Sequence, residues 1–286
     1  MLRSKNVVER RAAVLGLSAL RRPTVDAVRA LLDALVDDND IDLEVIRALF
    51  VMRGAVHATL DELLRDLRSR SVAERRRAAD HLALTANWAE EHLESAACVR
   101  RALIEGSTDE DEEVRRATCV ALGHWKSDES EARQSLLRRL IDPSSLVRAA
   151  ACVALREYGA EVAKDVSEVA ARLRDVDPDV REAAAEAVGR ICAAHRDALA
   201  TKVSSVGRPT ALDLAGIGSD GGLQNPTARV LLAGLLGDSD TRCVKAALNA
   251  MIAIVPLEDS ERDQIAGLRT HADPGIRTLA RVMLSG

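Results

Sequence analysis

The chain contains very few aromatic residues. Its 286 residues include two tryptophans, one tyrosine and one phenylalanine, yet 47% of the chain is apolar. Because each ring normally buries about 150–250 Å², most of the core must come from alanine, leucine, valine and isoleucine. A composition rich in helix formers and poor in aromatic residues favours an all-α fold. The four aromatic residues are Phe50, Trp88, Trp125 and Tyr158.

Other shortages exclude whole classes of protein. The net charge is -5, so no overall positive field attracts nucleic acid or anionic lipid. The five cysteines form an odd set without a C-x-x-C motif, which argues against a disulfide framework or a zinc site. The longest uncharged apolar stretch, residues 246–257, is too short to span a bilayer, and the first five residues lack a secretory signal. We therefore expect a monomeric cytoplasmic protein without a membrane segment.

One pattern recurs along the chain: an apolar anchor, a basic residue, and small apolar residues three, four, seven and eight positions after the anchor. These positions share one face of an α-helix. A fixed period in this range is typical of stacked repeats. The anchors are Val45, Arg75, Val114, Val147, Val180, Val244 and Ile276, which are separated by 30, 39, 33, 33, 64 and 32 residues.

A second amphipathic stretch, richer in leucine, lies between the copies, so each repeat is predicted to be a helical hairpin of roughly 32 residues. The interval of 64 residues equals two periods, which predicts a degenerate copy and a glycine-rich loop near 202–225. The leucine-rich helices are expected at residues 24–36, 56–67, 130–141, 160–173 and 226–236.

Helix-start signals agree with this division. Asp142-Pro143, Asp177-Pro178 and Asp273-Pro274 each predict an N-cap aspartate before a proline in the first turn. Ser71 and Glu74 have the spacing of a capping box. We therefore expect repeat helices to start at these points.

The segment Asp175-Val-Asp-Pro-Asp-Val-Arg-Glu-Ala-Ala resembles the HEAT-repeat family, in particular the HEAT-like repeats named after phycobilisome lyases. The resemblance covers residues 1–286 as a single repeat domain. It implies an all-α, right-handed α-solenoid of about eight hairpins after a lone first helix. Most members of the family are scaffolds that bind proteins along a concave surface, and a minority bind nucleic acid or catalyse reactions.

Several motifs suggest chemistry but have a plainer explanation. Residues 216–221 match G-x-G-x-x-G, yet the chain has no parallel-sheet pattern to support a dinucleotide site, so we expect a loop. Two D-x-D-x-D runs, at residues 38–42 and 175–179, lack the glycine that a calcium loop needs and are expected to cap helices. No histidine precedes a glutamate, which excludes the iron-binding His-Glu pattern of the HEAT-fold deoxyhypusine hydroxylases. We expect no active site, metal or cofactor.

Two pairs of residues occupy equivalent repeat positions. Cys119 and Cys152 both lie five residues after their anchors, and we expect buried thiols, although nearby arginines leave a reactive thiol open. Trp125 and Tyr158 both lie eleven residues after their anchors, where they either close the hairpin ends or, with Trp88, form a recognition cluster.

Basic residues form two columns. The residue one after the anchor is basic in nearly every copy, including Arg148, Arg181, Lys245 and Arg277, and the resemblance implies that each pairs with an aspartate of a turn. The residue two after the anchor is Arg47, Arg77 and Arg116 in consecutive copies, and Arg11 extends this column if the first helix is aligned. A glutamate three residues earlier offers each of Arg47, Arg77 and Arg116 an ion pair, but the column could instead bind an acidic peptide or a phosphate backbone.

The leading hypothesis is a non-catalytic scaffold that presents a concave surface to a protein partner. The candidate partner-binding residues are Arg47, Arg77, Arg116, Trp88, Trp125 and Tyr158. Two alternatives stay open: a nucleic-acid-binding protein of the type of the HEAT-like alkylpurine DNA glycosylases, and a bilin lyase-type subunit suggested by the name of the repeat family.

Overall fold

The computed structural model describes residues 2, 4–20, 22–37, 42–89, 93–125, 130–206, 226–252 and 257–285. Their packing divides the chain into two compact units, residues 1–125 and 126–286. Each unit is described by itself. All regular structure in the described residues is helical, and no helix among them is long and apolar enough to cross a membrane.

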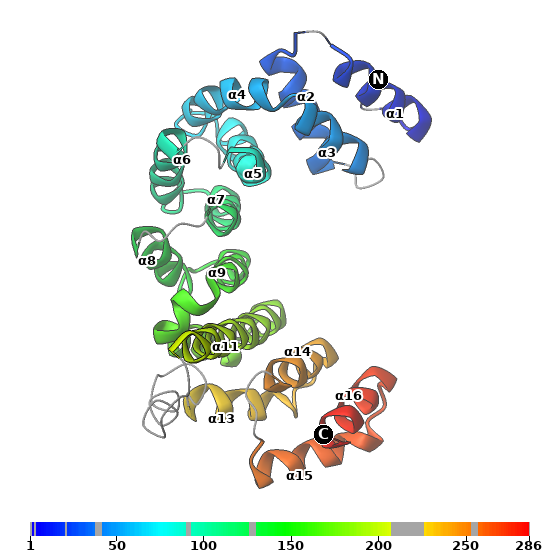
Figure 1. The fold of residues 1–286 in the computed structure, drawn as a ribbon, viewed down its shortest axis with the longest axis vertical. Coiled ribbons are helices and arrows are strands. Elements are labelled where there is room, and N and C mark those ends of the chain that lie inside the picture. The colour runs from blue at the N-terminus through cyan, green and yellow to red at the C-terminus, as the bar shows by residue number, and fades with distance from the viewer. Residues whose placement is uncertain are drawn as a thin grey trace. The chain divides into compact units, whose positions relative to one another are not determined.

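The helices alternate between two kinds (Figure 1). The helices that carry the repeated apolar pattern are called stripe helices, and those between them companion helices. In the first unit the stripe helices are α1 (Val7–Ser18), α3 (Asp42–Val51), α5 (Val72–Ala89) and α7 (Glu112–His124), and the companion helices are α2 (Val25–Asp37), α4 (Arg53–Asp66) and α6 (Leu93–Gly106).

The second unit continues the same alternation. Its stripe helices are α9 (Ser145–Tyr158), α11 (Pro178–Val206), α14 (Thr241–Ile252) and α16 (Pro274–Ser285). Its companion helices are α8 (Ser130–Arg139), the segment formed by η2 (Gly159–Asp165), α10 (Val166–Ala170) and η3 (Ala171–Arg174), then α13 (Pro226–Leu235) and α15 (Asp259–Gly267), which η4 (Leu268–Thr270) extends.

Stacking of stripe helices builds each unit. Helix α5 packs on α7 in the first unit, and in the second unit α9 packs on α11, α11 on α14 and α14 on α16. The described residues therefore form α1 followed by seven hairpins, and the predicted all-α solenoid is confirmed. Alanines such as Ala79, Ala151 and Ala184 are fully buried in these interfaces, which lets backbones approach without rings.

The predicted degenerate copy and glycine-rich loop near 202–225 stay a prediction, because residues 207–225 lie outside the described residues. Within the described residues helix α11 stacks directly on α14. A Cβ built on Gly189 of α11 would lie 2.7 Å from the Cα of Ala250 in α14. The interval of 64 residues includes most of the long α11, the segment 207–225 and α13.

The capping bonds also correct the register of two copies. The N-cap stands three residues before the anchor in α7, α9 and α11, where Asp111, Ser144 and Asp177 precede Val114, Val147 and Val180. The N-caps of α5 and α14 are Ser71 and Asp240. The same spacing of three residues therefore places their anchors at Glu74 and Cys243, one residue before the predicted anchors. The buried Cys243 fills this position in α14, whereas Glu74 is exposed.

Most predicted helix starts are found, with two differences. Helices α11 and α16 begin at Pro178 and Pro274, as predicted, but α9 begins after Ser144, two residues beyond Asp142. The Oδ1 of Asp142 instead accepts a bond from the backbone N–H of Ser144 at 3.0 Å, which shapes the turn. At α5 the Oγ of Ser71 accepts from Glu74 N at 3.4 Å, but the Glu74 side chain accepts a bond from Ser69, so only half of the capping box forms.

Candidate interaction surface

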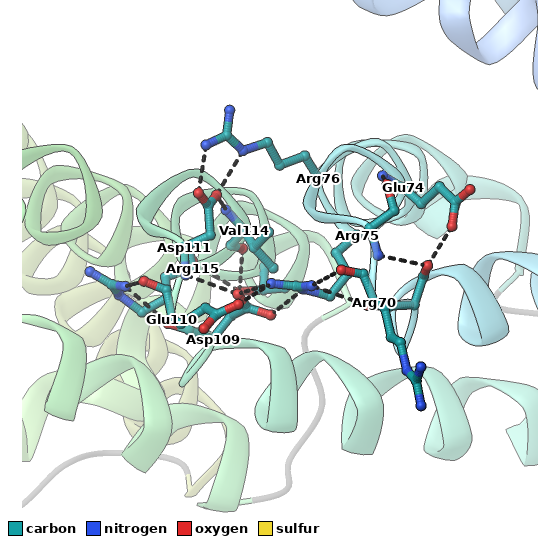
Figure 2. Close-up of polar contacts among 12 residues, drawn as sticks. Arg70, Glu74, Arg75, Arg76, Asp109, Glu110, Asp111, Val114 and Arg115 are labelled. Carbon is teal, nitrogen blue, oxygen red and sulfur yellow. Dashed lines mark hydrogen bonds and ion pairs between the residues drawn. The ribbon is translucent and has the colours of Figure 1, made fainter.

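A ladder of buried ion pairs joins successive hairpins. In the first unit Arg75 of α5 reaches the turn before α7, where its Nε and Nη2 donate to the two carboxylate oxygens of Asp109 at 2.8 and 3.0 Å (Figure 2). Its Nη1 donates back to the carbonyl of Ser69 at 3.1 Å. The two charged side chains are only 10% and 12% exposed, so Arg75 links one hairpin rigidly to the next.

The second unit repeats this arrangement. Arg148 pairs with Asp175, and Arg181 pairs with Asp238 at 2.8 Å, each arginine donating through Nε and Nη2. Hydrogen bonds from Arg181 hold the pKa of Asp238 below its usual value. In the corrected register Lys245 lies two residues after its anchor, and its Nζ is 2.8 Å from Oδ2 of Asp273, the N-cap of α16. The pairing of basic residues with turn aspartates, expected from the resemblance, is therefore confirmed at these three positions.

Arg277 behaves differently from the other members of this column. Its Nη1 donates to the carbonyls of His271 and Ala272 at 2.7 and 2.8 Å, within its own turn. Arg148 and Arg181 make the same backbone bonds in addition to their aspartate pairs. Arg148 and Arg181 thus close the turn before their own helix and also bridge to the turn before the next stripe helix, whereas within the described residues Arg277 closes only its own turn.

The companion helices carry a second set of ion pairs, which the sequence patterns did not indicate. Arg29 of α2 lies 2.5 Å from Asp66 of α4, and Arg229 of α13 lies 2.6 Å from Glu261 of α15. The partners are 37 and 32 residues apart, close to one repeat. This spacing between opposite charges on leucine-rich helices is the signal that would have identified them.

The second arginine column is partly engaged by acidic residues. The corrected register places Arg76, not Arg77, two residues after its anchor, in line with Arg47 and Arg116. Arg76 donates to both carboxylate oxygens of Asp111, the N-cap of α7, and these bonds lower the pKa of Asp111 to about 2 (Figure 2). Arg116 lies 2.7 Å from Glu113 and 3.4 Å from Asp80. These two arginines stabilise the stack of α5 and α7.

Arg47 and Arg77 are more weakly paired with acidic residues than Arg76 and Arg116 within the described residues. Arg77 has 52% of its side chain exposed, and its nearest acidic oxygen, Oδ1 of Asp33, is 3.8 Å away. Arg47 is exposed on α3, and Glu44, its predicted partner, pairs instead with Arg11 at 3.1 Å. In the described part of the chain Arg47 forms no ion pair. The predicted pairing with the preceding glutamate therefore holds for Arg116 but not for Arg47 or Arg77.

The described rings of the predicted recognition cluster are buried. Trp125 is 4% exposed and Tyr158 is 3% exposed, at the C-terminal ends of α7 and α9. The indole Nε1 of Trp125 donates to the carbonyl of Leu82 at 2.6 Å, which anchors the end of α7 to α5. Trp88 belongs to α5, but its side chain lies outside the described residues. Trp125 and Tyr158 thus close hairpin ends, one of the two roles that their position allowed.

The cysteine pair has no reactive environment. Cys119 and Cys152 are both fully buried, and burial raises the pKa of Cys152 to about 12. Burial likewise raises the pKa of Cys192 to about 11, and only Cys98 is exposed among the five. A thiol with a raised pKa is a poor nucleophile, so the expectation of buried structural thiols is confirmed.

The acidic runs act as caps where they can be described. Asp175 Oδ1 accepts a bond from Asp177 N at 3.1 Å, and Asp177 Oδ1 accepts one from Asp179 N at 2.9 Å. Most of the first run, residues 38–41, and the glycine motif at 216–221 lie outside the described residues. No group of three or more His, Cys, Asp or Glu side chains in the described part of the chain is placed to hold a metal ion.

Comparison with known proteins agrees with this geometry. Residues 100–189 match the family model of HEAT repeats. An archaeal HEAT-like repeats protein from Thermococcus onnurineus NA1 is similar over 96% of this chain and 95% of its own, with a TM-score of 0.53 and 16% identity. A designed armadillo repeat protein in complex with the peptide (KR)4 is similar over 79% of this chain and 98% of its own, with a TM-score of 0.54 and 18% identity.

An engineered protein is also similar, over 79% of this chain and 95% of its own, with a TM-score of 0.57 and 20% identity. No curated protein matches the chain significantly. The fold and the stacked hairpins define an α-solenoid repeat protein. The resemblance to the HEAT-repeat family is confirmed: residues 100–189 carry HEAT repeats, and hairpins of the same design continue on both sides.

Proposed function

We propose that the chain is a non-catalytic scaffold that binds a protein partner through the exposed faces of its stripe helices. One observation carries this proposal: the basic residues of the stripe helices divide into two groups. Those one after the anchor, such as Arg75 and Arg148, are buried in the stack, whereas Arg47 and Arg77 are exposed, with no ion pair for Arg47 and a weak one for Arg77 within the described residues. Exposed, unneutralised arginine is a frequent anchor in protein interfaces.

The charge of these side chains selects the partner. The designed armadillo protein is in complex with the basic peptide (KR)4. In the first unit of this chain the exposed basic residues of α3 and α5 are Arg47, Arg76 and Arg77, which favours a segment of opposite, acidic charge. Arg116 and Arg76 already have carboxylate neighbours, so they contribute less attraction for a ligand.

Nucleic-acid binding is less well supported than protein binding. A phosphate backbone needs several free positive charges along its path, because each neutralised phosphate adds to the affinity. Arg76 and Arg116, which hold the column position in the corrected register, are paired with acids, and the whole chain is acidic. Nothing in the described residues favours glycosylase or bilin chemistry.

Site-specific photo-crosslinking in a lysate of the source cells tests the scaffold function. A photoreactive amino acid replaces Ala73, exposed on α5, or Asp61, exposed on the companion helix α4 as the control. We expect discrete protein adducts from position 73, absent from position 61 and reduced when Arg47→Glu and Arg77→Glu are combined. Equal adducts from both positions, or none from position 73, would contradict the proposal.

A further inference from the structure

One stripe helix exposes an apolar face that its counterparts bury. On α3 the side chains of Leu43, Ile46 and Phe50 are 68%, 41% and 61% exposed, although α3 also buries Val45 and Leu49 on its other side. Seven large apolar side chains in the first 51 residues are exposed in this way. They are Val8, Leu15, Leu20, Leu43, Ile46, Phe50 and Val51.

The repeat register shows why this face is unusual. Phe50 lies five residues after the anchor Val45, the position that Ala79, Cys152 and Ala185 occupy in α5, α9 and α11. Those three side chains are fully buried in helices that stack on the next stripe helix. Ile46 holds the position of the ladder arginines, so α3 has apolar residues where other stripe helices bridge to the following turn.

The next stripe helix does not cover this face. In α9 and α11 the anchor and the third residue after it are buried valine and alanine, but in α5 these positions are Glu74 and Arg77, both exposed. In the described residues α3 packs on α1, α2 and α4, without the extensive contact that joins α5 to α7 (Figure 1). The sequences of α3 and α5 therefore leave the face of α3 that carries Ile46 and Phe50 without a stacked stripe helix in the described part of the chain.

Two features of the surroundings define what fits the face. Arg47 lies within the apolar stripe, one turn from Leu43, and forms no ion pair within the described residues. Arg77, on α5, has only a 3.8 Å contact to Asp33. Both arginines favour a negatively charged group close to an apolar one.

A pocket extends the apolar surface beyond the end of α3. Its volume is about 440 Å³, and its lining includes Pro23, Val51, Met52 and Ala55. Val51 directly follows Phe50 in the sequence and is 68% exposed. A cavity of this size and lining accepts a large apolar side chain.

We infer that the exposed face of α3, formed by Leu43, Ile46, Arg47 and Phe50, docks an amphipathic helix of a partner protein that carries acidic residues beside its apolar stripe. The inference rests on the proposed scaffold function and names the partner's chemistry. The docked helix lays apolar side chains at i, i+3 or i+4, and i+7 along α3, with a carboxylate facing Arg47. Its apolar stripe replaces the missing contact with α5.

Selection from a displayed library of helical peptides tests the docking face. The full chain is immobilised, and selected peptides are titrated against the wild type and single variants. We expect peptides with an apolar i, i+4, i+7 stripe flanked by Asp or Glu, and an affinity at least tenfold lower for Phe50→Gln. Val176→Gln is the matched control, because Val176 is 91% exposed in the second unit, and we expect it to leave affinity within twofold of wild type.

Charge exchange makes the test specific. Arg47→Glu should weaken binding, and replacing the facing peptide carboxylate by lysine should restore binding to Arg47→Glu but not to the wild type. Selected peptides whose affinity is unchanged by Phe50→Gln would overturn the docking face while leaving the scaffold function intact. A wild-type dimer in sedimentation that Phe50→Gln dissociates would overturn it too, because a second copy would then cover the face. Loss of the crosslinked adducts at position 73, by contrast, concerns the proposed function alone.

Discussion

Gly189 of α11 lies against Ala250 of α14 so closely that a Cβ at position 189 would stand 2.7 Å from the Cα and 2.9 Å from the Cβ of Ala250. Real side chains do not tolerate these separations, so Gly189→Ala must push the two helices apart. We expect the variant to lose roughly 1–3 kcal/mol of unfolding free energy. Urea denaturation followed by circular dichroism measures this loss.

Gly234→Ala is the matched control for that experiment. Gly234 is also helical, in α13, but a Cβ there would meet nothing within 4 Å. Alanine should therefore stabilise this position by about 0.5–1 kcal/mol, since glycine loses more backbone entropy on folding. Equal effects at the two positions would show that α11 and α14 do not stack as described.

The Arg148–Asp175 pair predicts a large effect from a single ladder residue. Asp175 keeps only 5% of its side chain exposed, so Arg148→Met would leave a carboxylate with little solvent to replace the arginine. We expect a loss of roughly 1.5–3 kcal/mol, and a double variant with Asp175→Asn that is less destabilised than the sum of the two single variants. Thermal unfolding of the four proteins gives this coupling.

An exposed ion pair supplies the comparison. Arg68 and Glu105 are 3.0 Å apart, but their side chains are 57% and 56% exposed. Arg68→Met should therefore change the unfolding free energy by less than about 1 kcal/mol. A similar loss for Arg68→Met and Arg148→Met would mean that burial does not determine the strength of the ladder.

The ladder also shows which parts of the fold the sequence predicts. Periodic Val-Arg-Ala patterns located α7, α9 and α11 because their anchors are apolar. The register failed by one residue in α5, where the anchor position is the exposed Glu74, and in α14, where Cys243 takes the place of valine. The apolar periodicity alone could not give the register of α5 and α14, because the capping turn, and not the row of apolar residues, defines where each helix starts.

The candidate interaction face was harder to predict than the fold. Arg47 and Arg116 look equivalent in the sequence, but of the two only Arg116 forms ion pairs within the described residues, with acids on its own and the adjacent helix. Similarly, Phe50 fits an apolar pattern, and its exposure follows from polar residues at Glu74 and Arg77, one repeat later. Such features depend on contacts between repeats, which the pattern within one repeat does not contain.

Thiol chemistry provides a test of burial. Burial raises the pKa of Cys152 to about 12 and that of Cys192 to about 11, whereas Cys98 is exposed. We expect iodoacetamide at pH 8 to modify the native chain once, at Cys98, and to modify the other cysteines only after unfolding. Mass spectrometry of the native and urea-treated protein counts the adducts. Rapid native labelling of Cys152 would contradict the packing of α9 on α11.

His81 gives the first unit a predictable dependence on pH. The side chain is fully buried in α5, with Nε2 3.0 Å from Oδ1 of Asp33, although neither ring nitrogen makes a well-aligned hydrogen bond within the described residues. Burial lowers the pKa of His81 to about 4, with Asp33 opposing this effect and Arg29 and Arg77 adding to it. The imidazole is therefore neutral in the folded chain at neutral pH.

The unfolded chain binds a proton at His81 near pH 6.5, and the folded chain only near pH 4. Between these values the unfolded state holds more protons, so acidification destabilises the fold by up to roughly 3 kcal/mol, whereas above pH 6.5 the effect vanishes. We expect His81→Leu to flatten urea-unfolding stability between pH 6.5 and 4.5. Asp111→Asn is the control, because the pKa of Asp111 falls from 3.8 to about 2 and its contribution is lost only below that window. An equally steep pH dependence in His81→Leu would refute this role of His81.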